Sequence, residues 1–162
     1  MIECNLKIRR AEREDCIDIY SLMCEFAEYV KLRDKLKVDI ETLESELFDN
    51  KSAVVLIAEL NDKPIGYALY FTFFSSFIGK RGIHLEDLYI SPKHRNKGYG
   101  KTLLKTIAEN ALKNNFIRIQ WSCLKWNAKA IDFYNSIGAK LYDDSVVFKL
   151  ENEKMKELID KI

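Results

Sequence analysis

Apolar and polar residues alternate along residues 4–10, which is the pattern of a half-buried β-strand. Residues 12–30 instead repeat apolar side chains at helical spacing and predict an amphipathic helix. A second, short helix is expected to begin after Asp39, a good N-cap, and to run through Phe48. The first part of the chain therefore predicts a strand followed by two helices.

The middle of the chain is rich in β-branched and aromatic residues and predicts consecutive strands at 52–60, 65–74 and 83–90. Residues 61–64 have the composition of a hairpin turn, and a loop is expected at 75–82. Because strands joined by short turns pair in opposite directions, this region predicts an antiparallel meander.

After the meander the pattern changes repeatedly between the helical and the extended period. It predicts a helix at 98–114, a strand at 116–123, a helix at 127–137 that Gly138 ends, a strand or hairpin at 139–150, and a helix at 151–162. A strand–helix–strand crossover after a meander implies an α/β (α+β) fold: a mixed, mostly antiparallel central sheet with helices on both faces. A length of 162 residues suits one domain spanning residues 1–162.

Composition and charge exclude several classes of protein. The net charge is +1, from 26 basic and 25 acidic side chains, so no global field favours nucleic acid or an anionic membrane. The N-terminus lacks a basic segment followed by an apolar run, and the longest apolar stretch is too short and mixed to span a bilayer. The 4 cysteines and 2 histidines lack zinc-site spacing, so we expect reduced thiols, no metal and a cytoplasmic location.

The segment with the clearest chemical character lies between a predicted strand and a predicted helix and reads Arg95, Asn96, Lys97, Gly98, Tyr99, Gly100, Lys101. Glycines allow a ligand to approach the backbone, and the first turn of a helix offers unpaired N–H groups to an anion such as pyrophosphate. The segment matches neither the P-loop nor the dinucleotide pattern. From the residues alone, an anion-binding loop and a simple glycine-containing turn with exposed basic side chains both stay open.

Two adjacent carboxylates, Glu86 and Asp87, occupy the predicted strand 83–90. Strand side chains alternate between faces, so the two are expected to point oppositely, and at least one would be buried or line a cleft. A chemical task and a structural ion pair are both open for each carboxylate. His84 is expected on the face of Glu86, and His94 at the surface.

Two further candidates lie on the predicted helix 127–137. Asn127 is placed to cap this helix, and Tyr134 shares it with apolar residues. A capping role alone for Asn127, and core packing with a satisfied hydroxyl for Tyr134, are the plain alternatives to a role in catalysis.

Three motifs in order support a family resemblance. They are L-E-D-L-Y-I at 85–90, R-x-x-G-x-G at 95–100 and W-N-x-x-A-x-x-F-Y at 126–134. Together they resemble the GCN5-related N-acetyltransferase (GNAT) superfamily, and within it the diamine group of spermidine/spermine and thialysine acetyltransferases. The inferred element order fits that fold over nearly the whole chain.

The resemblance implies direct transfer of an acetyl group, in a ternary complex, from acetyl-CoA as co-substrate to a primary amine of a small molecule. It assigns deprotonation of the amine to Glu86 and protonation of the leaving thiolate to Tyr134. The cofactor-binding positions that it implies are Leu88, Tyr89, Ile90, Arg95, Asn96, Lys97, Gly98, Tyr99, Gly100, Lys101 and Asn127. The substrate-binding positions are Glu25, Phe77, Glu86 and Asp87. Family members often form homodimers through the last strand and helix, so a homodimer is expected.

Departures from the diamine pattern narrow the range of expected substrates. Ser75 and Phe77 stand where polyamine enzymes carry an acidic residue and a tryptophan, and the segment 31–37 is basic and would repel a polycation. A smaller diamine or a lysine-like amino acid is therefore preferred to spermine. Two alternatives stay open: a catalytically inert acyl-CoA-binding module, and an acetyltransferase acting on proteins or peptides.

Overall fold

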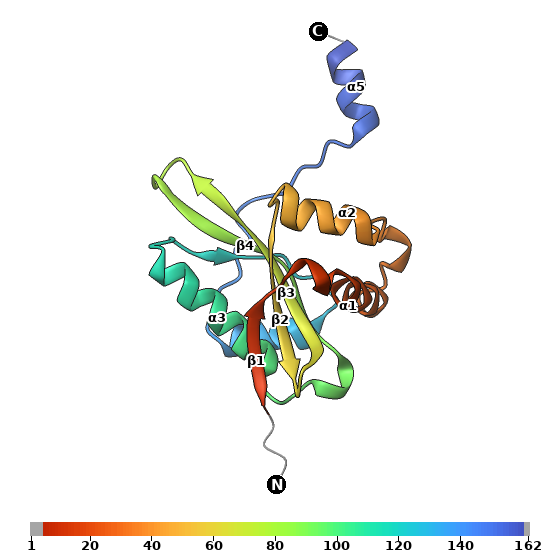
Figure 1. The fold of residues 1–162 in the computed structure, drawn as a ribbon. Helices are drawn as coiled ribbons and strands as arrows, with labels where there is room; N and C mark the ends of the chain where they lie inside the picture. Colours follow the sequence, from red (N-terminus) through yellow and green to blue (C-terminus); the bar gives the residue numbers. More distant parts are fainter. Residues whose placement is uncertain (1–4, 161–162) are drawn as a thin grey trace. The chain divides into compact units, whose positions relative to one another are not determined.

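The computed structural model describes residues 5–160 and divides into two compact units between Ser122 and Cys123. The elements of both units are labelled in Figure 1. The expectation of one domain over residues 1–162 stays a prediction.

The first unit contains a five-stranded sheet in the order β1-β2-β3-β4-β5. Its strands are β1 (Leu6–Arg10), β2 (Val54–Leu60), β3 (Lys63–Ser75), β4 (Lys80–Ile90) and β5 (Ile119–Gln120). The first three pairings are antiparallel and β4 pairs with β5 in parallel, so the prediction of a mixed, mostly antiparallel sheet is confirmed.

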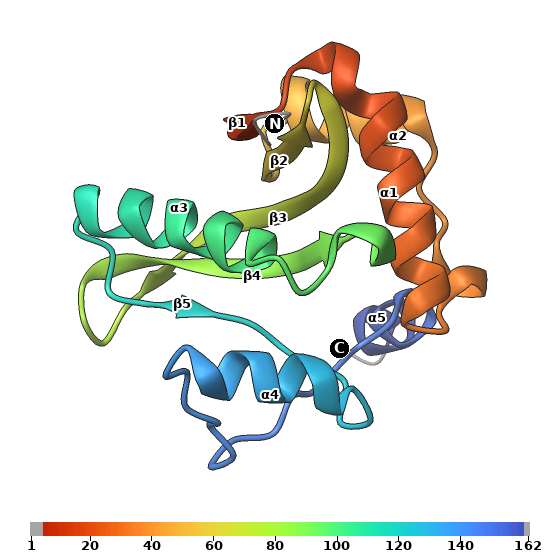
Figure 2. The same cartoon turned by 90° about the horizontal axis from the view of Figure 1, so that it is seen from below.

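Helices lie on both faces of this sheet, as predicted (Figure 2). One face carries α1 (Cys16–Tyr29), which a 3-10 turn at Arg13–Asp15 precedes, and α2 (Ile40–Glu44), which continues as a π-helical turn at Ser45–Asp49. The other face carries α3 (Tyr99–Lys113), which contacts β1, β2, β3 and β4. Short 3-10 turns at Arg33–Lys35 and Pro92–His94 complete the unit.

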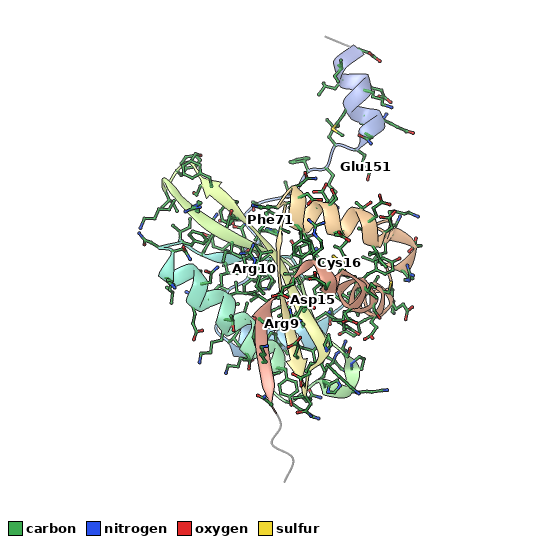
Figure 3. All side chains as sticks on the ribbon, in the orientation of Figure 1. Arg9, Arg10, Asp15, Cys16, Phe71 and Glu151 are labelled. Atoms are coloured by element: carbon green, nitrogen blue, oxygen red, sulfur yellow. The ribbon has the colours of Figure 1, made fainter. Side chains whose placement is uncertain are left out.

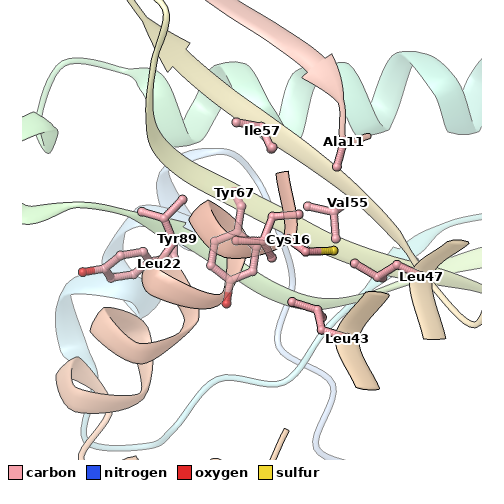
Figure 4. Packing of buried hydrophobic residues seen from close by; sticks show 10 residues of the cluster. Ala11, Cys16, Leu22, Leu43, Leu47, Val55, Ile57, Tyr67 and Tyr89 are labelled. Carbon is pink, nitrogen blue, oxygen red and sulfur yellow. The ribbon is translucent and has the colours of Figure 1, made fainter. Parts of the chain in front are cut away.

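The core under α1 and α2 is built from alternate strand positions and from the apolar stripe of α1. Ile57 on β2, Tyr67 on β3 and Ile19 on α1 have no exposed surface, and Tyr89 on β4 lies in the same cluster (Figure 4). The period of two on the strands and the period of 3.6 on the helix place these side chains together. This packing fixes α1 against the half of β4 that carries the predicted carboxylates.

A buried ion cluster secures the start of α1. The guanidinium of Arg9 on β1 donates two hydrogen bonds of 2.7 Å to the carboxylate of Asp15 and two more, of 2.6 and 2.8 Å, to Oε1 of Glu59 on β2. Arg9 and Asp15 lie side by side in Figure 3. The bidentate geometry is the favourable one for an arginine–carboxylate pair, and Arg9 lowers the pKa of the Asp15 carboxyl, mainly through these hydrogen bonds.

The second unit contains α4 (Ala128–Ser136) and α5 (Asn152–Asp160). The prediction of a strand or hairpin at 139–150 is wrong, because these residues form no strand and their apolar side chains, such as Val147 and Phe148, are exposed. A strand needs a neighbouring strand to pair its backbone groups, and the described residues of this unit contain none. A strand-like composition is therefore not sufficient for these residues to form a strand.

Two further boundaries differ from the prediction. The strand expected at 116–123 is paired only at Ile119–Gln120, and the loop expected at 75–82 shortens because β3 and β4 extend into it. Among the helices of the described chain, none has the length and apolar character needed to cross a bilayer. The described residues also contain no cluster of three or more His, Cys, Asp or Glu side chains suited to a metal ion.

Candidate active site

A β-bulge interrupts β4 at the predicted carboxylates. Leu69 of β3 lies opposite Asp87, and the next residue, Tyr70, lies opposite Leu85, so Glu86 is an extra residue on β4. A bulge of this kind bends the strand and changes the direction of a side chain, and such bulges are frequent beside active sites.

The bulge places Glu86 and Asp87 on the same face of the sheet. The ring of His84 stacks on Phe71 at 4.9 Å, with its Nε2 3.5 Å from Oε2 of Glu86, while Tyr67 donates a 2.9 Å hydrogen bond to Oδ2 of Asp87. Tyr67 and Phe71 lie four residues apart on the regularly alternating β3 and so share the face covered by α1. The prediction that the two carboxylates point oppositely is wrong, because the extra residue shifts the alternation.

The two carboxylates have different environments. Glu86 is exposed, whereas Asp87 is half-buried. Burial, opposed by the hydrogen bond from Tyr67 and aided by the negative charge of Glu86, raises the pKa of Asp87 from 3.8 to about 6. A carboxyl that titrates this close to neutral pH is suited to acid–base chemistry or to binding a cation.

The C-terminal half of β4 has an open edge. On one side Leu88, Tyr89 and Ile90 pair with β3. On the other side the ladder with β5 covers only Ile83 and His84, so among the described residues no strand pairs with β4 beyond them. An unpaired strand edge is a template for an extended ligand that hydrogen-bonds to the backbone.

The loop after β4 has the geometry of an anion-binding turn. Asn96 and Gly98 adopt positive φ of 61° and 82°, and α3 begins at Tyr99. The first N–H groups of a helix have no carbonyl partner within it and attract anions. Lys97 and Lys101 are exposed beside this turn. These features could hold a pyrophosphate group, and the anion-binding role of the loop stays a prediction.

An orphaned polar atom supports the same interpretation. His94 was expected at the surface, but it is half-buried, and its Nδ1 is enclosed without a hydrogen-bond partner. A buried nitrogen without a partner is unfavourable unless a ligand or water satisfies it. Residues 94–101 therefore fit the polar part of a coenzyme.

The side chain of Arg95 is directed away from the loop turn. Its Nε donates a 2.8 Å hydrogen bond to the carbonyl of Ile90, and its guanidinium lies 4.2 Å from the ring centroid of Tyr29 and 5.3 Å from that of Tyr89. These contacts connect the start of the loop to α1 and β4. Its predicted contact with the coenzyme stays a prediction.

Glu25 connects α1 to the end of β4. Its Oε2 accepts hydrogen bonds from Tyr89 at 3.1 Å and from Ser91 at 2.7 Å. Burial and the neighbouring carboxylate raise the pKa of Tyr89 to about 12, so its hydroxyl remains a donor. The predicted role of Glu25 in substrate binding stays a prediction, beside this observed structural role.

Phe77 lies away from the two carboxylates. It lies in the turn between β3 and β4 and is fully exposed, whereas Glu86 and Asp87 lie toward the other end of β4. Its predicted role in binding the substrate stays a prediction.

Asn127 and Tyr134 belong to the second unit. The side chain of Asn127 accepts a 3.3 Å hydrogen bond from the N–H of Ala130, which confirms it as the N-cap of α4. Tyr134 is half-buried on the same helix, with its ring 5.3 Å from that of Phe133. Their roles toward coenzyme and thiolate stay predictions.

Sequence reasoning missed three contributors to this site: Tyr67, Ser91 and the ring of Tyr29. A tyrosine within an otherwise aliphatic strand was the available signal for Tyr67, since a buried hydroxyl requires a partner. Neither Ser91 nor Tyr29 carried a comparable signal, because both act across elements distant in sequence.

Comparison with known proteins decides the family. The model of the acetyltransferase (GNAT) family matches residues 16–139. The chain belongs to the acetyltransferase (GNAT) family. It is thus an acyltransferase enzyme, and the matched GNAT region includes both carboxylates, the open edge of β4, the loop and α4.

Individual GNAT relatives agree with this assignment. The chain is 36% identical over 166 residues to the thialysine N-epsilon-acetyltransferase of Sus scrofa, covering 95% of this chain and 97% of that one. It is 34% identical over 105 residues to an L-ornithine N5-acetyltransferase of Arabidopsis thaliana, covering 64% and 46%. The solved structure of an integron cassette protein from the mobile metagenome of V. cholerae is similar with a TM-score of 0.80 and 26% identity, covering 95% and 97%.

Proposed function

We propose that this GNAT enzyme transfers the acetyl group of acetyl-CoA to a primary amine of a small, lysine-like amino acid or diamine, by direct attack in a ternary complex. The observation that carries the proposal is the bulge in β4, which places Glu86 and Asp87 on one face beside an unpaired strand edge. The two units together would form one acetyltransferase domain, since the family match spans the division between them.

The loop and the strand edge offer complementary sites for the coenzyme. The N–H groups at the start of α3, with Lys97 and Lys101, would hold the pyrophosphate. The backbone of Leu88 and Ile90 would pair with the extended pantetheine arm, as in strand addition. Holding the thioester in this way supplies the orientation that can contribute ~7–11 kcal/mol to a bimolecular reaction.

The chemistry then requires one proton acceptor and one proton donor. The amine nitrogen attacks the thioester carbonyl carbon, a C–N bond forms, and the C–S bond breaks with departure of the thiolate. Glu86 would take the proton that the amine loses, directly or through water. Tyr134 would give its phenolic proton to the thiolate, since an unperturbed tyrosine with a pKa of ~10 is protonated at neutral pH. A backbone N–H near Leu88 would polarise the carbonyl.

The charge around the site supports a small cationic substrate. Glu86 and Asp87 present two carboxylates, which favour an ammonium group. The segment 31–37 carries four basic residues and one acidic residue, and this charge would repel a long polycation. The relatives named for thialysine and for L-ornithine act on amino acids of this kind.

We also propose that the enzyme acts in the cytoplasm as a homodimer. Exposed apolar side chains in the second unit, Val146, Val147, Phe148 and Leu158, support an intersubunit contact. Light scattering during size-exclusion chromatography should detect twice the mass of one 19.0 kDa chain. Detection of the mass of one chain alone would reject the dimer.

A panel assay tests the proposed function. Thiol release from acetyl-CoA would be measured with thialysine, ornithine, lysine, diamines, spermidine and a lysine-containing peptide, for the wild type and for Glu86→Gln and Tyr134→Phe. We expect release that depends on a small amine and is weakened in both variants. Tight binding of acetyl-CoA without release for any acceptor would indicate an inert binding module, and release with the peptide alone would indicate a protein acetyltransferase.

A further inference from the structure

Tyr67 connects the core to the candidate active site. It lies in β3 with no exposed surface, and its hydroxyl donates a 2.9 Å hydrogen bond to Oδ2 of Asp87. A buried tyrosine hydroxyl requires an acceptor, and here the acceptor is a site carboxylate, not a backbone carbonyl. The hydrogen bond therefore connects a fixed core residue to Asp87 of the candidate active site.

The strand register explains how the two groups meet. Tyr67 lies directly opposite Tyr89, and Leu69 lies opposite Asp87, so the tyrosine reaches its acceptor diagonally across the β3–β4 ladder. The bulge at Glu86 is what places Asp87 on this face.

We propose that Tyr67 is a positioning residue that keeps the Asp87 carboxylate ionised and fixed for an ammonium group of the substrate. The inference rests on the proposed function and deepens it. Among the described residues the Asp87 carboxylate accepts one hydrogen bond, from Tyr67 through Oδ2, so Oδ1 is available to a ligand. The phenol supplies the donor that a half-buried carboxylate needs.

The groups around this pair otherwise favour the neutral acid. Glu86 and Tyr89 lie beside Asp87 on β4, Cys24 and Glu25 approach from α1, and Tyr67 approaches from β3. Arg95 lies over the rings of Tyr29 and Tyr89 and is not paired with Asp87. Burial and the charge of Glu86 both raise the pKa of Asp87, and the hydrogen bond from Tyr67 lowers it. Tyr67→Phe removes the lowering contribution alone.

Tyr70 offers a matched control. It is also a buried tyrosine of β3, but its hydroxyl accepts a 3.4 Å hydrogen bond from Asn110 of α3, on the opposite face of the sheet. Tyr70→Phe therefore removes a buried hydroxyl of the same strand without touching Asp87.

The first readout does not depend on activity. Aspartate carboxyl carbons would be labelled with ¹³C and titrated by NMR, with the Asp87 signal identified by its absence in Asp87→Asn. We expect the midpoint of Asp87 to rise by about one to two pH units in Tyr67→Phe, as for loss of a hydrogen bond to a charged group, and to stay unchanged in Tyr70→Phe. An unchanged midpoint in Tyr67→Phe, or an equal shift in both variants, would overturn the inference.

The second readout is kinetic. The kcat/KM for the amine is measured in Tyr67→Phe and in the wild type, and the first value is divided by the second. Ionisation of the substrate affects both values equally, so it does not change this ratio. We expect this ratio to fall about tenfold near pH 6.5 and to recover above pH 8.5, while the Tyr70→Phe ratio stays flat with pH. A shifted NMR midpoint with a flat ratio would reject the role toward substrate. Absence of turnover in the wild type would reject the proposed function. The NMR titration would then still test whether Tyr67 keeps Asp87 ionised.

Discussion

The carboxylate of Glu25 on α1 accepts a 2.7 Å hydrogen bond from the hydroxyl of Ser91, the residue that follows β4. The N–H of Ser91 also donates a 2.8 Å hydrogen bond to the carbonyl of Ile65. Ser91 begins the segment that leads to the loop at 95–101. Through this contact a helix on the side of the carboxylates supports the entry to the predicted coenzyme loop.

Glu25→Ala tests this support. Loss of the two hydrogen bonds should raise the KM for acetyl-CoA about fivefold and lower the free energy of unfolding by about 1 kcal/mol. Glu28→Ala is the control. Glu28 is exposed on the same helix, and its one ion pair among the described residues is a 4.0 Å surface contact with Arg33, which contributes little to stability. A rise confined to the KM for the amine would show instead that Glu25 binds the substrate directly.

Gly98→Ala tests the coenzyme loop. Gly98 has φ of 82°, and a Cβ there would meet no atom within 4 Å, so the expected cost of about 1 kcal/mol comes from the backbone conformation alone. We expect the Kd for CoA in calorimetry to rise about fivefold as the loop relaxes. Gly79→Ala, at φ of 68° in the β3–β4 turn with the same open surroundings, should lose similar stability and keep the Kd. Equal Kd values in both variants would contradict the loop assignment.

Asp15→Asn tests the ion cluster at the start of α1. Arg9 lowers the folded-state pKa of Asp15 below its ordinary value of 3.8, so the cluster contributes stability above about pH 4 and loses it as pH falls through the folded pKa. We expect the variant to lose about 2 kcal/mol in urea unfolding at pH 7, with a smaller difference at pH 3. Asp18→Asn, exposed on the same helix, should change little at either pH, and a loss independent of pH would reject the ionic contribution.

Asp87→Asn should stabilise the fold and inactivate the enzyme. The folded-state pKa of Asp87, raised from 3.8 to about 6, means that the folded state binds more protons between these values, so stability falls as pH rises through this window. At pH 7.5 the neutral amide should therefore be about 2 kcal/mol more stable than the wild type in urea unfolding, with the difference vanishing near pH 3.5. A variant less stable than the wild type at pH 7.5 would show that the ionised carboxylate is favourable in the fold.

Sequence patterns predicted the first unit well because its elements obey simple periods. The stripe of α1, the strands β2 to β4 and the glycine-rich start of α3 all follow from local spacing. The cap at Asn127 followed from its residue type and its position before a helix.

The relation of Glu86 to Asp87 could not be predicted in the same way. A bulge depends on the register between two strands, and a period of two along one strand does not reveal an extra residue. The segment 139–150 failed for a related reason, since strand composition does not supply a pairing partner. The contacts of Arg95, Glu25 and Tyr67 likewise join residues that are distant in sequence.

The central claim is that acetyl transfer to an amine depends on Glu86. The direct measurement is quantification, by mass spectrometry, of the N-acetylated product and of CoA formed from acetyl-CoA and thialysine, for the wild type, Glu86→Gln and the exposed α3 control Glu109→Gln. We predict one acetylated amine per CoA, a kcat/KM lowered about 100-fold or more in Glu86→Gln near pH 7.5, and no change in Glu109→Gln. A wild-type rate in Glu86→Gln, or no acetylated amine from a wild-type protein that binds acetyl-CoA, would contradict the account.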